Sequence, residues 1–255
     1  MNRFGLSSLL VFCGLVLLWE TAVQRAGVSE MILPAPSAIA AVLYDGLIAG
    51  FLWPHIWTTT SETLLGLFLG CSIGFLSGLI LSENPKLRRI LWPYILASQV
   101  VPKLALGPLF IIWFGFGITS TVIITALICF FPLLENTLTG LETAKREKRD
   151  LFRMLGASRL QTLIRLKIPT GLPMIMTGVR IAGVLALVGA VVGEFIGGNS
   201  GLGASIIAAQ GMMDSALMFA LFIVIAVLGL LVYHLTAALE YFVLRGLKRN
   251  RKPYV

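Results

Sequence analysis

The chain has 255 residues, of which 57% are hydrophobic and only 13% are charged, whereas globular domains are about a quarter charged. It cannot bury so much apolar surface in one water-soluble core, and its long apolar runs indicate an all-α, polytopic membrane protein. The net charge of +8 would suggest nucleic-acid binding in a soluble protein. Here the charges belong to loops, so we expect no nucleic-acid partner.

No catalytic or cofactor site emerges from the sequence. Cys13, Cys71 and Cys129 lie far apart inside apolar runs, which favours neither a disulfide framework nor a metal site. There is no G-x4-G-K-[ST] phosphate-binding loop, and no Ser/His/Asp, Cys/His or paired-carboxylate arrangement at catalytic spacing. We therefore expect no enzyme activity, no bound cofactor and no metal in this chain. If ATP powers the protein, a partner hydrolyses it.

The first apolar run covers residues 6–23. It could be a cleaved signal peptide, but no convincing small-x-small cleavage site precedes Gln24, so we favour an uncleaved first span. Beyond it, Pro36 is expected to open an amphipathic helix that runs to about Leu47. That helix is too short and too mixed to span a bilayer, and we place it in the outer interface.

The second expected span, residues 63–81, carries Gly66, Gly70, Gly74 and Gly78 at intervals of four. Such a stripe lets another helix backbone approach closely, and we expect it to pack within one subunit. The third expected span, residues 90–112, is interrupted by Pro93, Pro102 and Pro108. Proline removes backbone hydrogen bonds that must be restored by neighbours or in a lined cavity. The fourth expected span covers residues 119–138.

Residues 142–170 form the one long polar island of the chain. Eight basic and three acidic residues fall within it, and apolar residues recur at helical spacing at Leu151, Leu155, Leu163 and Leu166. Gly156 can end one helix and Ser158 can cap the next. The segment therefore predicts two short helices, each apolar on one side and cationic on the other. A solvated cytoplasmic loop that follows the positive-inside bias is the simpler alternative.

This island resembles the EAA loop of ABC-importer permeases, whose usual form is E-A-A-x3-G-x9-I-x-L-P. Asp150 stands for the Glu, Gly156 and Pro169 match directly, and Leu166 and Ile168 replace the Ile and Leu. Leu151 and Phe152 depart from the two alanines. With the W-F-G at Trp113 and the G-A-S-R that begins at Gly156, the chain most resembles the nitrate, sulfonate and taurine branch of that family.

The resemblance implies that the loop is the coupling helix that docks on a separate ATPase subunit. It assigns that contact to Asp150, Leu151, Leu155, Gly156, Ala157, Ser158, Arg159, Leu166, Ile168 and Pro169. It also implies two ATPase copies that carry ATP and Mg²⁺, a second permease copy, and a periplasmic or lipid-anchored solute-binding protein. The expected location is the bacterial inner membrane, in contact with lipid.

The fifth and sixth expected spans cover residues 174–195 and 216–241, with a short apolar helix at residues 204–210 between them. Placing both termini in the cytoplasm puts nearly all basic residues on that side, including the coupling loop and the tail. The exceptions are Arg25, which falls outside, and Lys103 and Arg180, which lie within spans. The sequence thus predicts a six-span permease with both ends inside.

Four residues are candidates for the translocation path: Gln99, Pro102, Lys103 and Glu194. A lysine at a proline break is costly unless it faces water, a carboxylate or the protein interior, so Lys103 either lines the path and favours anions or has a structural role. Glu194 could shape an outer gate or make structural hydrogen bonds. For Arg180 we expect snorkelling or a pair with Glu135.

The expected function is ATP-driven import of a small solute by alternating access. A small anion of nitrate, sulfonate, taurine or bicarbonate type is the first choice of solute. A pyrimidine or flavin precursor, or another organic solute, is the alternative. A stand-alone secondary transporter fits less well, because intramembrane ion-coupling carboxylates and internal repeats are not evident.

Overall fold

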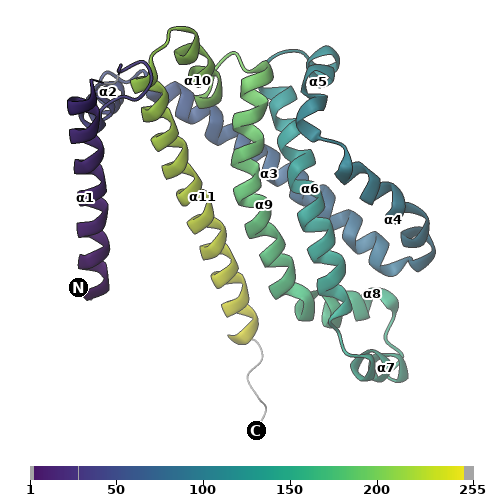
Figure 1. Ribbon diagram of the computed structural model, residues 1–255. Helices are drawn as coiled ribbons and strands as arrows, with labels where there is room; N and C mark the ends of the chain where they lie inside the picture. Colours follow the sequence, from purple (N-terminus) through teal and green to yellow (C-terminus); the bar gives the residue numbers. More distant parts are fainter. Residues whose placement is uncertain (1–2, 28, 250–255) are drawn as a thin grey trace.

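The structure is a computed structural model that describes residues 3–27 and 29–249, and in these residues all regular structure is helical (Figure 1). The longer helices are α1 (Arg3–Ala26), α2 (Pro36–Ile48), α3 (Leu52–Glu83), α4 (Pro85–Val100), α6 (Ile118–Glu142), α9 (Ile168–Gly197), α10 (Leu202–Gly211) and α11 (Ser215–Arg249). The shorter ones are a 3₁₀ turn (Lys103–Leu106), α5 (Gly107–Phe114), α7 (Arg146–Met154), α8 (Arg159–Thr162) and a π-helical turn (Leu163–Lys167).

The core of the molecule is the three-helix bundle of α3, α6 and α9, in which α6 makes the most extensive contacts, with α9 and with α3. The glycine stripe of α3 faces α6, as expected from its spacing. A Cβ added at Gly78 would lie 2.7 Å from the Cβ of Thr137, and one added at Gly74 would press on backbone atoms near Phe130. Because the stripe has no side chains, the two backbones approach closely, and the prediction of packing within one subunit is confirmed.

The six expected spans are only partly matched. Within the described residues, four helical stretches are long and apolar enough to cross a membrane: Leu52–Glu83, Ile118–Glu142, Arg159–Gly197 and Ser215–Gly246. They contain the expected second, fourth, fifth and sixth spans. The expected first span lies in the 24-residue helix α1, where several side chains fall outside the described residues. Basic residues of the tail beyond Arg249 also lie outside them.

The expected third span is interrupted, as its prolines indicated, but only one of the three prolines marks a break. Residues 90–112 are divided between α4, the 3₁₀ turn and α5, and neither α4 nor α5 reaches spanning length. The break falls before Pro102, where Val101 takes an extended conformation with ψ 122°. Proline disfavours helical backbone in the residue before it, which explains the position of the break. Pro93 stays inside α4, and Pro108 lies in the first turn of α5, where its missing N–H is tolerated.

The second span is longer than expected, because α3 begins at Leu52, two residues after a left-handed Gly50 (φ 86°). Pro54 lies in its first turn and does not interrupt it. Helices α2, α5 and α10 lie at one end of the bundle, and α7 and α8 at the other (Figure 1). The described ends of α1 and α11 point toward the α7–α8 end, as the expected topology requires.

Candidate functional site

The turn between α7 and α8 is built by the residues that the sequence singles out. Gly156 has φ 72°, its N–H donates to the carbonyl of Arg153 over 3.0 Å, and the N–H of Ala157 donates to the carbonyl of Phe152 over 3.0 Å. This pair of bonds is a Schellman motif, and it needs a residue that accepts positive φ. The prediction that Gly156 ends the first helix is confirmed.

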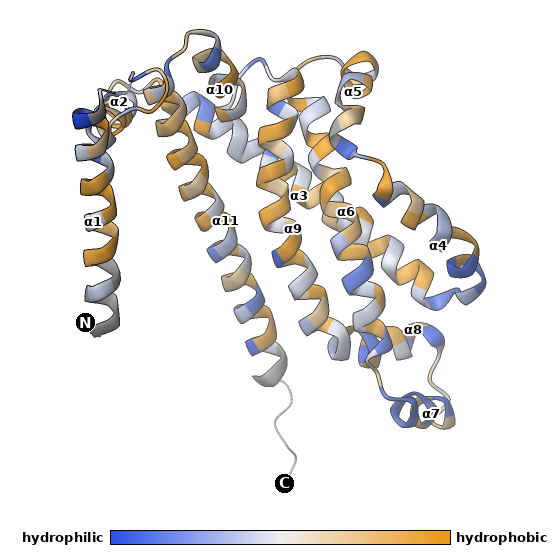
Figure 2. Ribbon diagram, viewed as in Figure 1, coloured by the Kyte–Doolittle hydropathy of each residue, from blue (hydrophilic) through white to orange (hydrophobic). Residues whose placement is uncertain are grey.

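Ser158 then caps α8. Its Oγ accepts a hydrogen bond from the N–H of Gln161 over 3.2 Å, and its own N–H donates to the side-chain oxygen of Gln161 over 2.8 Å. The two bonds form a capping box that fixes the direction in which α8 leaves the turn. The predicted cap is confirmed. Figure 2 shows α7 and α8 at one end of the bundle, with α7 mostly hydrophilic and hydrophilic and hydrophobic residues mixed at α8.

An apolar face of this loop remains uncovered. Leu151, Met154 and Leu155 are exposed, the last two at 85% and 74%, and Leu160 and Ile164 continue the exposed surface. Leu151, Met154 and Leu155 lie outside the four stretches that could span a membrane, where an exposed apolar patch marks an interaction surface. Of the residues assigned to coupling, Leu151, Leu155, Gly156, Ser158 and Arg159 are therefore on the surface.

The other assigned residues hold the loop to the bundle. Leu166 is buried, and Ile168 and Pro169 begin α9. The π-helical turn Leu163–Lys167 precedes them, and the stretch Arg159–Gly197 is continuous from α8 into the membrane span. Because Pro169 has no N–H, the usual i→i−4 bond is missing at this point. Asp150, by contrast, lies in α7 and pairs within that helix with Arg153 (3.2 Å) and Arg146 (4.0 Å).

An ion pair ties the loop to α3. Lys167 Nζ lies 2.6 Å from Glu83 Oε1, and both side chains are mostly buried. Close backbone contact between Gly140 of α6 and Gly171 of α9 fixes the same region, since a Cβ on Gly140 would lie 2.7 Å from the carbonyl oxygen of Gly171. The ion pair and the glycine contact together anchor the base of the loop to the bundle.

Lys103 lies in the break between α4 and α5 and is half-buried. Its ammonium group donates to the side-chain oxygen of Gln99 over 2.8 Å, and no carboxylate of the described residues lies within ion-pair distance of it. Gln99 is partly buried in the last turn of α4, and Pro102 directly before Lys103 is exposed. Three of the four expected path residues are thus neighbours.

Glu194, the fourth, lies in a different setting. It is 2% exposed, accepts a 2.6 Å hydrogen bond from the hydroxyl of Thr59, and accepts another, of 2.5 Å, from the N–H of Gly203. The hydroxyl of Thr59 in turn accepts from the N–H of Leu202 over 2.8 Å. These bonds join α3, α9 and α10 at the outer end, which suits the structural alternative for Glu194.

Glu62 shares this cluster, and the sequence analysis missed it. Its side chain is 2% exposed beside Glu194, and its Oε2 has no hydrogen-bond partner among the described residues. His55 belongs to the same helix face, and its Nδ1 accepts from the N–H of Gly201 over 3.2 Å. The helical spacing of His55, Thr59 and Glu62, which places them on one face of α3, is the sequence feature that could have predicted this polar cluster.

The expectation for Arg180 needs a correction. Its guanidinium pairs with Glu240 of α11 over 3.3 Å and not with Glu135, which is exposed. Helix α9 packs on both α6, which carries Glu135, and α11, which carries Glu240. Either carboxylate could therefore pair with Arg180 as far as the sequence shows, and the packing selects Glu240. The described residues contain no group of three or more His, Cys, Asp or Glu side chains that could hold a metal ion.

Comparison with known proteins covers nearly the whole chain. Residues 66–249 match the family described as binding-protein-dependent transport system inner membrane component. The chain is 35% identical to a formylaminopyrimidine transport permease protein of Halalkalibacterium halodurans, over 96% of this chain and 98% of that protein. It is 38% identical to a riboflavin transport system permease protein of Chloroflexus aurantiacus, over 91% of this chain and 86% of that protein.

A taurine transport system permease protein of Escherichia coli is 30% identical over 94% of this chain and 86% of its own length. Among solved structures, a chain of a methionine ABC transporter in an inward-facing conformation has a TM-score of 0.66 at 17% identity. That match covers 78% of this chain and 98% of the other, which shows a shared fold.

Proposed function

Since the chain belongs to the family of binding-protein-dependent transport system inner membrane components, we propose that the apolar face of its α7–α8 loop is the docking surface for the importer's ATPase. The chain is the multi-pass permease subunit of an ABC importer and not its catalytic component. The observation that carries the proposal is the uncovered face of Leu151, Met154 and Leu155 outside the spans. A groove on the ATPase would remove this surface from water.

The loop is built to pass on motion. Gly156 and Ser158 fix the angle between α7 and α8, and α8 continues through the π-helical turn into α9. Closure of two ATPases on ATP and Mg²⁺, which bind on those partners, pulls two coupling loops together. The attached spans then switch a shared cavity between inward and outward access, as a bistable element.

This mechanism needs a second permease copy, because one chain supplies only one coupling loop and one wall of a path. Helix α4 supports this arrangement, since none of its described side chains is buried and it exposes Ile90, Leu91 and Tyr94. Mass measurement of the detergent-purified permease tests it. A dimer is expected, and a monomer that carries one ATPase would contradict it.

The solute is a small anion of nitrate, sulfonate, taurine or bicarbonate type. Lys103 supports this class, because its ammonium group stands at a helix break with only the amide of Gln99 as a hydrogen-bond partner among the described residues. An unpaired cation in a partly dehydrated path attracts an anion by a few kcal/mol, about 4 at an intermediate dielectric. The similarity to the taurine permease agrees with this choice.

A pyrimidine or flavin precursor is the second candidate. Identity to the formylaminopyrimidine and riboflavin permeases is higher, at 35% and 38%, than to the taurine permease, at 30%. Such solutes carry carbonyl oxygens and ring nitrogens that can accept hydrogen bonds from Lys103 and Gln99.

Uptake into vesicles that hold permease, ATPase and binding protein separates these candidates. Taurine, a formylaminopyrimidine and riboflavin are offered in turn, and only one class should be accumulated in an ATP-dependent manner. Lys103→Ala should lower uptake per folded permease, and Lys103→Arg should retain part of it. Normal uptake by Lys103→Ala would exclude Lys103 from the path, and accumulation of a heteroaromatic solute alone would replace the anion by the second candidate.

A further inference from the structure

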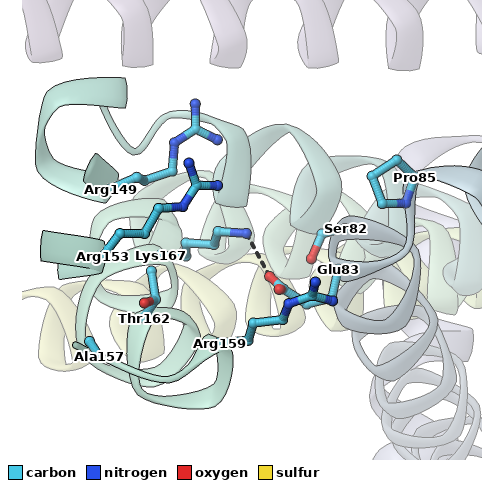
Figure 3. Close-up of a pocket in the computed structure, with 9 residues that line it drawn as sticks. All are labelled: Ser82, Glu83, Pro85, Arg149, Arg153, Ala157, Arg159, Thr162 and Lys167. Atoms are coloured by element: carbon cyan, nitrogen blue, oxygen red, sulfur yellow. Dashed lines mark hydrogen bonds and ion pairs between the residues drawn. The ribbon is translucent and has the colours of Figure 1, made fainter. Parts of the chain in front are cut away.

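A basic cavity lies between the α3–α4 turn and the coupling loop. It has a volume of about 450 Å³, and its wall includes Glu83 and Pro85 on one side and Arg149, Arg153 and Arg159 on the other. Figure 3 shows these side chains around the opening, with Lys167 bonded to Glu83. Segments that are far apart in the sequence thus converge on one space.

A second cavity, of about 520 Å³, shares Pro85, Arg149 and Lys167 with the first and extends along α4. It adds Arg88 and Arg89, with Glu142 as its one acid, which pairs with Arg88. We call the two together the basic groove. Its charged residues are Glu83, Arg88, Arg89, Glu142, Arg149, Arg153, Arg159 and Lys167.

The groove carries cations that no carboxylate of the described residues neutralises. Glu83 and Glu142 are taken by Lys167 and Arg88, and Arg153 pairs with Asp150. Within the described part of the chain, no carboxylate lies within 4.0 Å of Arg149 or Arg159. Arg149 lines both cavities and is only half exposed. Guanidinium groups gathered around a cavity are suited to bidentate recognition of phosphate.

The groove also lies at the end of a helix that is long and apolar enough to cross a membrane. Helix α3 ends at Glu83, and the second cavity has an apolar wall that includes Leu81, Trp92 and Leu141. The guanidinium of Arg88 lies 5.6 Å from the centre of the Trp92 ring. Tryptophan beside arginine at the end of a span is typical of the interface between headgroups and acyl chains. A soluble anion would need the charged part of this groove but not its apolar wall.

We propose that the basic groove binds the headgroup phosphate of an acidic phospholipid from the cytoplasmic leaflet. Arg149 and Arg159 bind the phosphate oxygens, and the acyl chains lie along the apolar wall of the second cavity. Basic pockets between spans at the cytoplasmic side are suited to such headgroups. The lipid would brace the α3–α4 turn against the loop that meets the ATPase.

The groove and the proposed ATPase surface lie on opposite faces of α7. Arg149 and Arg153 line the cavity, whereas Leu151 and Leu155 are exposed. The two pairs are offset by two residues, which at 3.6 residues per turn separates them by about half a turn. Both partners can therefore be bound at once, and the two proposals can fail separately.

The test uses the full-length permease, from which lipid is removed in detergent. The protein is titrated with phosphatidylglycerol or with phosphatidylcholine, and native mass spectrometry counts the lipid molecules bound. Wild type should bind phosphatidylglycerol preferentially. Arg149→Gln with Arg159→Gln should weaken that binding by about tenfold or more, since each basic group near an anionic lipid contributes about 1 kcal/mol. Lys148→Gln with Arg165→Gln is the matched control, because both residues are exposed outside the groove.

Four results would overturn the proposal. Equal loss in both double variants would mean diffuse attraction, and no loss in the first would exclude the groove. Inorganic phosphate that displaces phosphatidylglycerol at equal concentration would assign the groove to a soluble anion. Loss of ATPase co-purification in the Arg149 and Arg159 variant, with lipid binding retained, would assign these arginines to the ATPase contact. Arg149→Lys, which keeps the charge but not the bidentate geometry, should retain part of the lipid binding and controls for folding.

Discussion

The α3–α6–α9 bundle and the coupling loop are both helical, yet their side chains meet very different surroundings. In the bundle, Leu134, Leu138 and Ala186 are fully buried, and glycines bring backbones together. In the loop, Met154 and Leu155 remain exposed although the turn between them and α8 is fully capped. The bundle is complete within one chain, whereas the loop has a defined shape and an unfilled contact. The contrast separates residues that stabilise the folded permease from residues that contact another subunit of the importer.

The largest effect is expected in the bundle. A Cβ at Gly70 would lie 2.8 Å from the Cβ of Cys129 and 3.0 Å from the Cα of Ala126. Gly70→Leu forces α3 and α6 apart and should cost about 3 kcal/mol or more, seen as a large drop in folded yield and melting temperature. Gly14→Leu in α1, where a Cβ meets no atom within 4 Å, is the control. Equal melting temperatures for the two variants would contradict the claim that close packing of α3 on α6 stabilises the chain.

A smaller loss is expected from Glu194→Ala. The hydroxyl of Thr59 and the N–H of Gly203 would lose their acceptor in a buried site, at about 2 kcal/mol in total. The outer ends of α3, α9 and α10 should loosen, which amide hydrogen exchange in α10 would detect. Glu135→Ala on the exposed side of α6 should change neither quantity. If Glu194→Ala keeps wild-type stability and loses only uptake, Glu194 belongs to the gate instead.

In the loop, substitution should affect coupling more than folding. Gly156 has φ 72°, so Gly156→Trp places a bulky residue in a left-handed conformation at a local cost of about 1–2 kcal/mol. Uptake should be abolished while the permease remains inserted and its melting temperature stays close to wild type. Gly211→Trp, also in open space, is the control for bulk alone. Normal uptake by Gly156→Trp with ATPase bound would mean that the α7–α8 turn does not couple the ATPase to transport.

The smallest effect is expected from Ser158→Ala. Loss of the capping box should destabilise α8 locally by about 1 kcal/mol, because the N–H of Gln161 loses its acceptor. Hydrogen exchange at the start of α8 should speed up, with no change in the bundle. Ser98→Ala, in an exposed part of α4, serves as the comparison. Slower exchange or no change in α8 would show that the cap does not hold the turn.

The sequence predicts best where the signal is local. Glycine spacing in α3, the Gly156 turn and the Ser158 cap all depend on residues within one turn or one repeat of each other. An interruption of the proline-rich third span was expected, but which of its three prolines would break the helix was not. The restriction that Pro102 places on Val101 ends α4, whereas Pro93 is accommodated inside it.

Side-chain partners across helices were harder to predict. Arg180 meets Glu240 and not Glu135, and Glu194 meets Thr59 and Gly203 from α3 and the start of α10. Such pairs depend on helix rotation and depth, which hydropathy does not encode. Glu62 was missed for the same reason, since a single carboxylate near a span end looks solvated until the packing places it inside.

The most direct test of the contrast between bundle and loop measures ATPase binding to a permease whose loop has lost its apolar contact. Leu151→Ser with Leu155→Ser should leave the melting temperature unchanged, because both side chains are already exposed, and should weaken ATPase co-purification about tenfold or more. Lys148→Ser with Arg165→Ser, also exposed in the same loop, should retain the ATPase. Wild-type ATPase binding by the Leu151 and Leu155 variant would contradict the account.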